Sequence, residues 1–345
     1  MCKACTRLGF TCIYAPQQRS PPAPSSMPQP ATPGSWTTTD MELLHHYTTC
    51  GCVRIAPHTA RHRCWISDVP RLALSHLFLL HQILAVSALH CHTSAPHRTD
   101  LLGIASRHRA QALEQVQASF DSSKFDTGVA LFAFAGLTAI YAFYEPTTHL
   151  HDEDALNRLL ACFRLTRGIK TMLDLNRVEI ERSWARDMVD LDAQTAISRL
   201  HATGLRFDQA QVLEKMIQDH ADGSQAPNGE AEALRFAAQS CLDSIQALTL
   251  RNATDTDDEN HVLIMTWPND VSEIYLQALE RKTPVALVIL AHYAALMSLR
   301  HRFWWLTAWP EQIMEYVKAN ITEEWHKYLQ WPQLMLGKGS PAQDP

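Results

Sequence analysis

Three cysteines near the start of the chain have the spacing of metal ligands. Cys2, Cys5 and Cys12 form a C-x2-C-x6-C pattern within the opening run MCKACTRLGFTCIY. Two thiolates separated by two residues can both reach one tetrahedral zinc ion, at about 2.3 Å per Zn–S bond. A turn at Gly9 can return the third thiolate, which still leaves a structural zinc one ligand short. The pattern favours a partial zinc site, and the alternative is three reduced thiols in a flexible tail.

The rest of the chain has an ordinary globular composition, with 46% hydrophobic and 19% charged residues among 345. The formal net charge is -6, yet residues 1–39 contain Lys3, Arg7 and Arg19 and no acidic residue. The body is therefore acidic, and only the N-terminal segment should attract nucleic acid. No secretory signal pattern is recognisable, so we expect a reducing compartment in which the nine cysteines are thiols or metal ligands.

Other groups of reactive side chains give no catalytic pattern. His58, His62 and Cys64 lie in one short window, and residues 90–92 are His-Cys-His. Adjacent helical residues point to different faces, so we expect these groups on surface turns, with a second metal site as the alternative. The sequence holds no nucleophile elbow, phosphate-binding loop, zinc-protease motif, dinucleotide fingerprint or kinase motif set. It therefore predicts that the protein is not an enzyme.

A proline-rich segment separates the cysteines from a helical body. Residues 16–33 hold seven prolines and no apolar periodicity, so we expect a disordered linker over residues 16–39. The next run, DMELLHHYTT, begins with Asp40 as an expected N-cap and places Met41, Leu44 and Tyr47 on one helical side. Strand signals are scarce beyond it. The sequence therefore predicts an all-α fold.

Two strongly apolar helices are expected at the centre of this body. The stretch from Phe125 to Tyr144 carries one charged side chain, and residues 285–299 form the second expected centre. A helix that is apolar on every side is a buried one. The first stretch is near the ~20 residues that cross a bilayer, but Gly128 and Gly136 interrupt it. We therefore expect a core helix and no membrane span.

Further helices are expected around these two. They are predicted at residues 72–89, 105–120, 156–163 and 186–217, the last broken near Gly204, with loops at 221–229 and 252–260. Four basic residues accompany the third of these helices: Arg158, Arg164, Arg167 and Lys170. We expect a solvated face there, with an anion or partner site as the alternative.

The cysteine motif resembles the second half of the fungal binuclear zinc cluster, a six-cysteine DNA-binding module of fungal transcription factors. The resemblance implies that Cys2 corresponds to the fourth cysteine, which bridges two zinc ions, and Cys5 and Cys12 to the fifth and sixth. The first three cysteines and the basic DNA-recognition helix have no counterpart in this sequence. Lys3 and Arg7 could contact DNA phosphates, but two charges supply little of the counterion release that binding needs. We expect zinc-dependent DNA binding to be compromised by truncation, either because an upstream segment is missing from the sequence or because the DNA-binding half is lost.

The helical body is similar to the regulatory domain of fungal proteins related to the sterol uptake control regulators. The order and spacing of several motifs carry this resemblance: ELLHHYTT at 42–49, residues 69–90, Trp267-Pro268, residues 280–296, Trp304-Trp305 and Trp331-Pro332. In those relatives the domain holds a lipid in an apolar pocket and controls dimerisation or nuclear entry. The resemblance implies a pocket for a flat apolar ligand such as a sterol, lined by Phe132, Phe134, Tyr141, Trp304 and Trp305. The alternative role of these aromatic residues is core packing.

The sequence thus predicts a fungal transcription regulator of RNA polymerase II genes, either sterol-related or part of a secondary-metabolite cluster. Its expected parts are a partial zinc cluster at 1–15, a linker at 16–39, an all-α regulatory domain at 40–337 and a disordered tail at 338–345. Expected partners are DNA elements containing CGG and a second copy or a related factor. The expected location is the nucleus, or the cytoplasm until activation. The alternative is a helical ligand-binding or interaction protein without its own DNA-binding module, acting through a partner.

Overall fold

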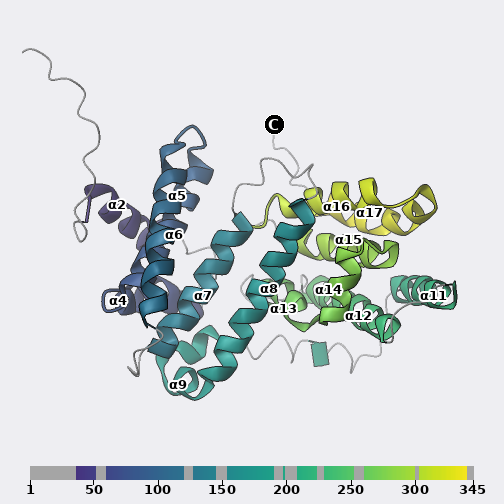
Figure 1. Cartoon of the computed structure of the whole chain (residues 1–345), viewed down its shortest axis with the longest axis horizontal. Coiled ribbons are helices and arrows are strands. Elements are labelled where there is room, and N and C mark those ends of the chain that lie inside the picture. The colour runs from purple at the N-terminus through teal and green to yellow at the C-terminus, as the bar shows by residue number, and fades with distance from the viewer. Residues whose placement is uncertain are drawn as a thin grey trace, which may run out of the picture. The chain divides into compact units, whose positions relative to one another are not determined.

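The structure is a computed structural model that describes residues 36–51, 60–119, 127–144, 154–189, 197–198, 208–223, 229–251, 260–299 and 303–339. Every regular element among these residues is helical, which confirms the predicted all-α fold (Figure 1). The chain divides into two compact units, residues 1–38 and 39–345, and the second holds nearly all described residues. Among the described helices, none combines the length and the hydropathy that a bilayer crossing needs.

The first part of the second unit is a group of short helices around one long hairpin. Its elements are α2 (Thr38–His46), the π-helical turn η1 (Tyr47–Gly51), α3 (Ala60–Arg63), the π-helical turn η3 (Cys64–Asp68), α4 (Val69–Ala73), α5 (Leu77–Ser94) and α6 (Asp100–Ser119). The helices α5 and α6 pack along each other more extensively than any other pair among the described helices. The helix expected at 72–89 begins only at Leu77, because His76 takes a non-helical conformation (φ -132°, ψ 86°).

Helix α2 differs from its sequence prediction in both its start and its buried side. It begins at Thr38, so Asp40 lies within its first turn instead of capping it. Tyr47 is buried as predicted and Leu44 is partly buried, but Met41 is 47% exposed and Leu43 is buried instead. The periodicity of the short segment was compatible with more than one buried side, and contacts with distant helices select the side that is buried.

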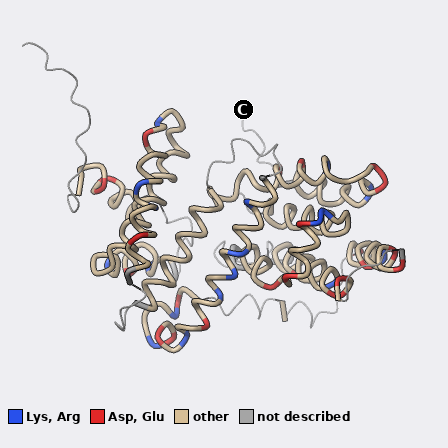
Figure 2. The backbone as a smooth tube through the Cα atoms, in the orientation of Figure 1, with Lys and Arg blue, Asp and Glu red and all other residues tan. Residues whose placement is uncertain are grey.

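The next helices are α7 (Thr127–Tyr144), α8 (Asp154–Leu175), α9 (Arg177–Arg182) and the 3-10 turn η4 (Trp184–Met188). Helix α7 packs against α5 and α8 and carries no Lys, Arg, Asp or Glu, so its tube is tan in Figure 2. Its described side chains are almost all buried, which confirms the core helix expected from its apolar composition. At Gly136 the indole ring of Trp65 crosses α7 so closely that a Cβ atom would lie 3.2 Å from Trp65 Cη2.

The C-terminal part is a set of helices around α15. Its elements are α11 (Asp208–Gly223), α12 (Glu230–Arg251), α13 (Asn260–Asp270), α14 (Glu273–Glu280), α15 (Pro284–Ser298), α16 (Trp309–Asn320), the 3-10 turn η5 (Glu323–Leu329) and α17 (Gln330–Gly339). Every residue from Val285 to Ser298 is buried, and α12, α16 and α17 pack around them. Trp267 stacks on Tyr293 with ring centroids 4.4 Å apart, and the Tyr293 hydroxyl donates to the Ile264 carbonyl over 3.1 Å. The second expected centre is therefore confirmed.

The fully buried His292 of α15 is held in its neutral form. Its Nδ1–H donates to the Val288 carbonyl over 2.9 Å, and Nε2 lies 3.0 Å from the Gln209 amide nitrogen, which must therefore be the donor. The ring stacks on Trp331 at 5.4 Å between centroids. Burial lowers the pKa of His292 to about 4. Unfolded histidine titrates near 6.5, so this contribution to stability is complete above pH 6.5 and is lost as the pH falls towards 4.

We predict that Gly136→Leu lowers the free energy of unfolding by about 1–3 kcal/mol, because the Trp65 ring must move away from α7. The matched control is Gly168→Leu in α8, where an added Cβ atom meets nothing within 4 Å. Leucine is the better helix former there, so this variant should be neutral or stabilised by up to about 1 kcal/mol. Urea unfolding followed by circular dichroism measures both variants. Equal effects would contradict the close packing of Trp65 on Gly136.

We further predict that His292→Gln flattens the loss of stability in acid. Protonation of His292 should remove about 3 kcal/mol of unfolding free energy between pH 6.5 and 4. Glutamine cannot take up that proton, so the variant should lose correspondingly less across this window. Urea unfolding at stepped pH values measures the slope, with the exposed His326→Gln as the control. A slope identical to that of the unchanged protein would contradict the neutral buried state of His292.

Candidate functional site

The predicted zinc and DNA contacts lie outside the described residues. This applies to Cys2, Cys5 and Cys12 and to Lys3 and Arg7, so their roles stay predictions. Within the described part of the chain, no three His, Cys, Asp or Glu side chains gather as a metal ion would require.

The predicted pocket residues on α7 are buried against other helices. The Phe134 ring meets Phe78 of α5 edge-on, with centroids 5.6 Å apart. The guanidinium of Arg109 on α6 lies 4.4 Å from the centroid of the Tyr141 ring. Phe132 is 9% exposed. These contacts contribute to the burial of Phe134 and Tyr141, and a shared ligand pocket around the three side chains stays a prediction.

The remaining two predicted residues lie in the turn that follows α15 and meet the end of α7. Trp304 contacts Tyr144 at 4.8 Å and His90 at 5.0 Å between ring centroids, and Trp305 meets Trp304 edge-on at 5.7 Å. Within the described residues, the indole N–H groups of both tryptophans are buried without a hydrogen-bond acceptor. By contrast, Trp309 donates to the Phe143 carbonyl over 2.6 Å. The turn therefore closes over the ends of α5 and α7 and holds two unpaired donors.

Two cavities in the described structure lie elsewhere. One of about 350 Å³ is lined by residues of α2, the end of α5 and the segment after it: Thr39, Glu42, Leu43, His45, His46, Thr49, Cys91, Arg98 and Leu101. The other, of about 370 Å³, lies between α11 and η5 and is lined by Met216, Asp219, His220, Glu324, Trp325, Lys327 and Tyr328. Neither lining includes any of the five predicted aromatic residues.

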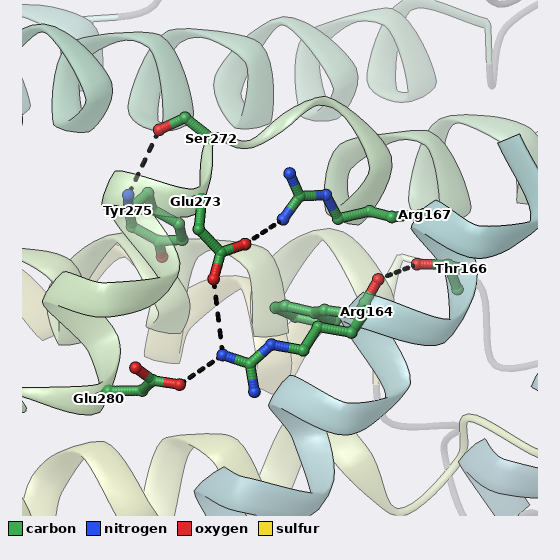
Figure 3. A network of polar contacts seen from close by, with 8 residues as sticks. Arg164, Thr166, Arg167, Ser272, Glu273, Tyr275 and Glu280 are labelled. Carbon is green, nitrogen blue, oxygen red and sulfur yellow. Dashed lines mark hydrogen bonds and ion pairs between the residues drawn. The ribbon is translucent and has the colours of Figure 1, made fainter. Parts of the chain in front are cut away.

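The basic residues of α8 form ion pairs with the neighbouring helices (Figure 3). Arg164 pairs with Glu280, and its guanidinium lies 3.6 Å from Glu273. Arg167 Nη1 donates to Glu273 Oε2 over 2.7 Å. Glu273 thus joins two arginines of α8 at the start of α14. Sequence patterning could not supply this arrangement, since the partners are more than 100 positions apart.

A further pair extends the same network to α13, where Lys170 Nζ lies 3.4 Å from Asp270 Oδ1. All of these side chains are partly exposed, so each pair contributes about 1 kcal/mol at most. The face expected to be merely solvated therefore fastens α8 to α13 and α14. Because acidic partners already neutralise these three basic groups, the geometry gives little support to the alternative of an anion site.

One buried and one partly buried imidazole contact join α2 to α6 and α5. His108 Nε2 lies 2.9 Å from the Asp40 carboxylate, and His108 Nδ1 lies 2.9 Å from His81 Nδ1. At the other end of α2, His46 Nε2 lies 2.8 Å from His90 Nδ1. Sequence analysis placed Asp40 as a helix cap and predicted a helix over 105–120, which includes His108. The signal that could have found these contacts was the presence of His81 and His108 among apolar positions of two neighbouring helices.

Comparison with known families agrees with the fold. Residues 42–142, from α2 to α7, match the family described as fungal specific transcription factor domain. Over 125 residues the chain is 33% identical to the Zn(2)-C6 fungal-type transcription factor afumD of Aspergillus fumigatus, covering 33% of this chain and 34% of that protein.

A second relative extends the similarity to most of the chain. Over 326 residues the chain is 24% identical to a Zn(2)-C6 fungal-type transcription factor of Gibberella zeae, covering 88% of this chain and 64% of that protein. Each match spans less than two thirds of the relative's own length. These matches agree with the predicted likeness to fungal Zn(2)-C6 regulators. The closer likeness to sterol uptake regulators and the missing half of the zinc cluster stay predictions.

Proposed function

We propose that this protein is a transcription regulator in which the helical body controls a zinc-dependent DNA-binding segment. The observation that carries the proposal is the fungal specific transcription factor domain between α2 and α7, within a similarity to a Zn(2)-C6 factor over 88% of the chain. Both relatives are named as transcription factors, which is consistent with a protein that is not an enzyme. Its place of action would be the nucleus, on RNA polymerase II genes.

The DNA-binding part of the proposal rests on the cysteine motif. Cys2, Cys5 and Cys12 would bind zinc, and Lys3 and Arg7 would contact phosphates of CGG-containing elements. Recognition of two such elements would need a second copy of the chain or a related factor. The alternative function, a helical interaction protein acting through a partner, applies if this chain binds no DNA.

The ligand part of the proposal rests on the turn after α15. The buried indole N–H groups of Trp304 and Trp305 lack acceptors among the described residues, and a buried unpaired donor costs about 1–3 kcal/mol. A flat apolar molecule with a single hydroxyl or carbonyl, such as a sterol, could supply an acceptor there. Ligand uptake at this turn would act directly on the ends of α5 and α7.

We predict that the purified full chain binds zinc and loses it in Cys5→Ser, because that substitution removes one of the three thiolates. Cys91→Ser, at a partly exposed free cysteine of α5, is the matched control and should retain the metal. Elemental analysis counts zinc per chain, and a mobility shift compares a duplex carrying CGG triplets with a scrambled one. Binding of zinc and preference for CGG, both lost in Cys5→Ser, would support the DNA-binding segment. Absence of zinc and of any preference would overturn it and favour the alternative function.

We also predict that a sterol raises the melting temperature of the full chain and changes its tryptophan fluorescence, because a ligand that binds only the folded state stabilises it. Cholesterol delivered from cyclodextrin is a suitable first probe. Trp305→Phe keeps an aromatic ring and removes the donor, so it should reduce both responses, whereas Trp325→Phe near the α11 cavity should not. Unchanged fluorescence and melting across sterols and cluster metabolites would remove the support for a ligand sensor.

A further inference from the structure

Helix α2 depends on a small number of side chains for its attachment. It approaches the other described helices only lightly, and Leu43 with Tyr47 of the following turn supply its fully buried apolar contacts. The polar contacts lie on either side of Leu43: Asp40 near the start of the helix and His46 at its end. Both contacts involve imidazole rings, so the protonation state of those rings affects how firmly α2 is held.

The hydrogen bonds that join Asp40, His108 and His81 form only when each proton lies on the correct atom. An ionised carboxylate only accepts hydrogen bonds, so His108 Nε2 carries the hydrogen that meets Asp40. In neutral His108 the other nitrogen then accepts, and His81 Nδ1 must be the donor over 2.9 Å. A proton added at His108 Nδ1 or on the carboxylate weakens or breaks one of these two bonds.

The second contact follows the same rule. The 2.8 Å separation between His46 Nε2 and His90 Nδ1 has room for one shared hydrogen. If both rings become cations, two N–H groups face each other and the contact turns repulsive. Acid therefore acts on both polar attachments of α2 in the same direction.

We propose that α2 is a latch that undocks from α5 and α6 when the histidines at its two attachments take up protons. Undocking would uncover Leu43 and Tyr47 together with the surfaces of α5 and α6 that α2 covers. The latch lies at the first helix of the body, within the sequence that leads from the predicted zinc ligands to the regulatory domain. It is independent of whether those ligands bind zinc.

Burial and the neighbouring charges determine the direction in which the pKa of each histidine shifts. Burial and the neighbouring His108 lower the pKa of His81 to about 4, while Asp40 opposes this shift and Arg107 adds to it. Burial likewise lowers the pKa of His108, against the hydrogen bond to Asp40. Helix α7, which packs on α5, contributes no Lys, Arg, Asp or Glu.

Burial and the adjacent His45 lower the pKa of His46 at the second attachment. Glu42 and Arg98 line the cavity beside His46, and the indole of Trp304 contacts the His90 ring. Histidines with a lowered folded pKa stabilise docking above about pH 6.5. The stabilisation is lost as the pH falls towards 4, so acid should open the latch.

Hydrogen exchange of the full chain tests the latch. Protection of amides 38–47, corrected for the intrinsic rate at each pH, should fall about tenfold or more between pH 7 and pH 5, while α7 keeps its protection. In the double variant His46→Gln/His108→Gln, glutamine can donate and accept in place of each imidazole without titrating. The fall should then be smaller than in the unchanged protein, because of the four histidines at the two attachments only His81 and His90 remain. His97→Gln, an exposed histidine in the turn between α5 and α6, is the control and should behave as the unchanged protein.

Two results would overturn the latch: protection of α2 falling in step with α7, or the double variant keeping the original pH profile. If circular dichroism shows that the double variant does not fold, Asp40→Asn decides. Asparagine can still accept from His108, but without the negative charge the pKa of the docked histidines falls further below the undocked value. Release should therefore move to higher pH by about half a unit or more, and an unmoved midpoint would overturn the proposal.

Discussion

Helix α15 is apolar on every side, and it can exist in water only where other helices cover it all round. That single requirement explains why α12, α16 and α17 converge on it. It also explains why the polar side chains of α15 are hydrogen-bonded, because a buried donor or acceptor without a partner destabilises the fold by more free energy than a typical hydrogen bond contributes. For this reason His292 and Tyr293 donate to backbone carbonyls. Trp331 stacks on the His292 ring, and Trp267 stacks on the Tyr293 ring.

In the part of the body that matches the fungal transcription factor domain, the apolar helix that needs cover is α7. Helices α5 and α8 pack against it. The family match ends within α7, at residue 142. The packing extends beyond the matched residues, because α8 packs against α7 and also forms ion pairs with α13 and α14.

Helix α2 differs from these core helices in the kind of contact that holds it. Apolar burial supplies most of the contacts of α7 and α15, whereas α2 combines two buried apolar side chains with hydrogen bonds between groups that titrate. The strength of such hydrogen bonds depends on where their protons lie. The first helix of the body is therefore the part most easily altered without disturbing the core.

The amino-acid sequence by itself determined the all-α class and the two buried helices, because a run that is apolar on every side leaves few alternatives to burial. The cysteine motif and the order of the body motifs were likewise enough to indicate the likeness to fungal Zn(2)-C6 regulators with which the comparisons agree. Only the tertiary structure decided which side of α2 is buried, that Asp40 meets His108, and that Arg164 and Arg167 pair with Glu273. These partners lie 68 and more positions apart, and local periodicity carries no information about which distant helix will pack on a given face.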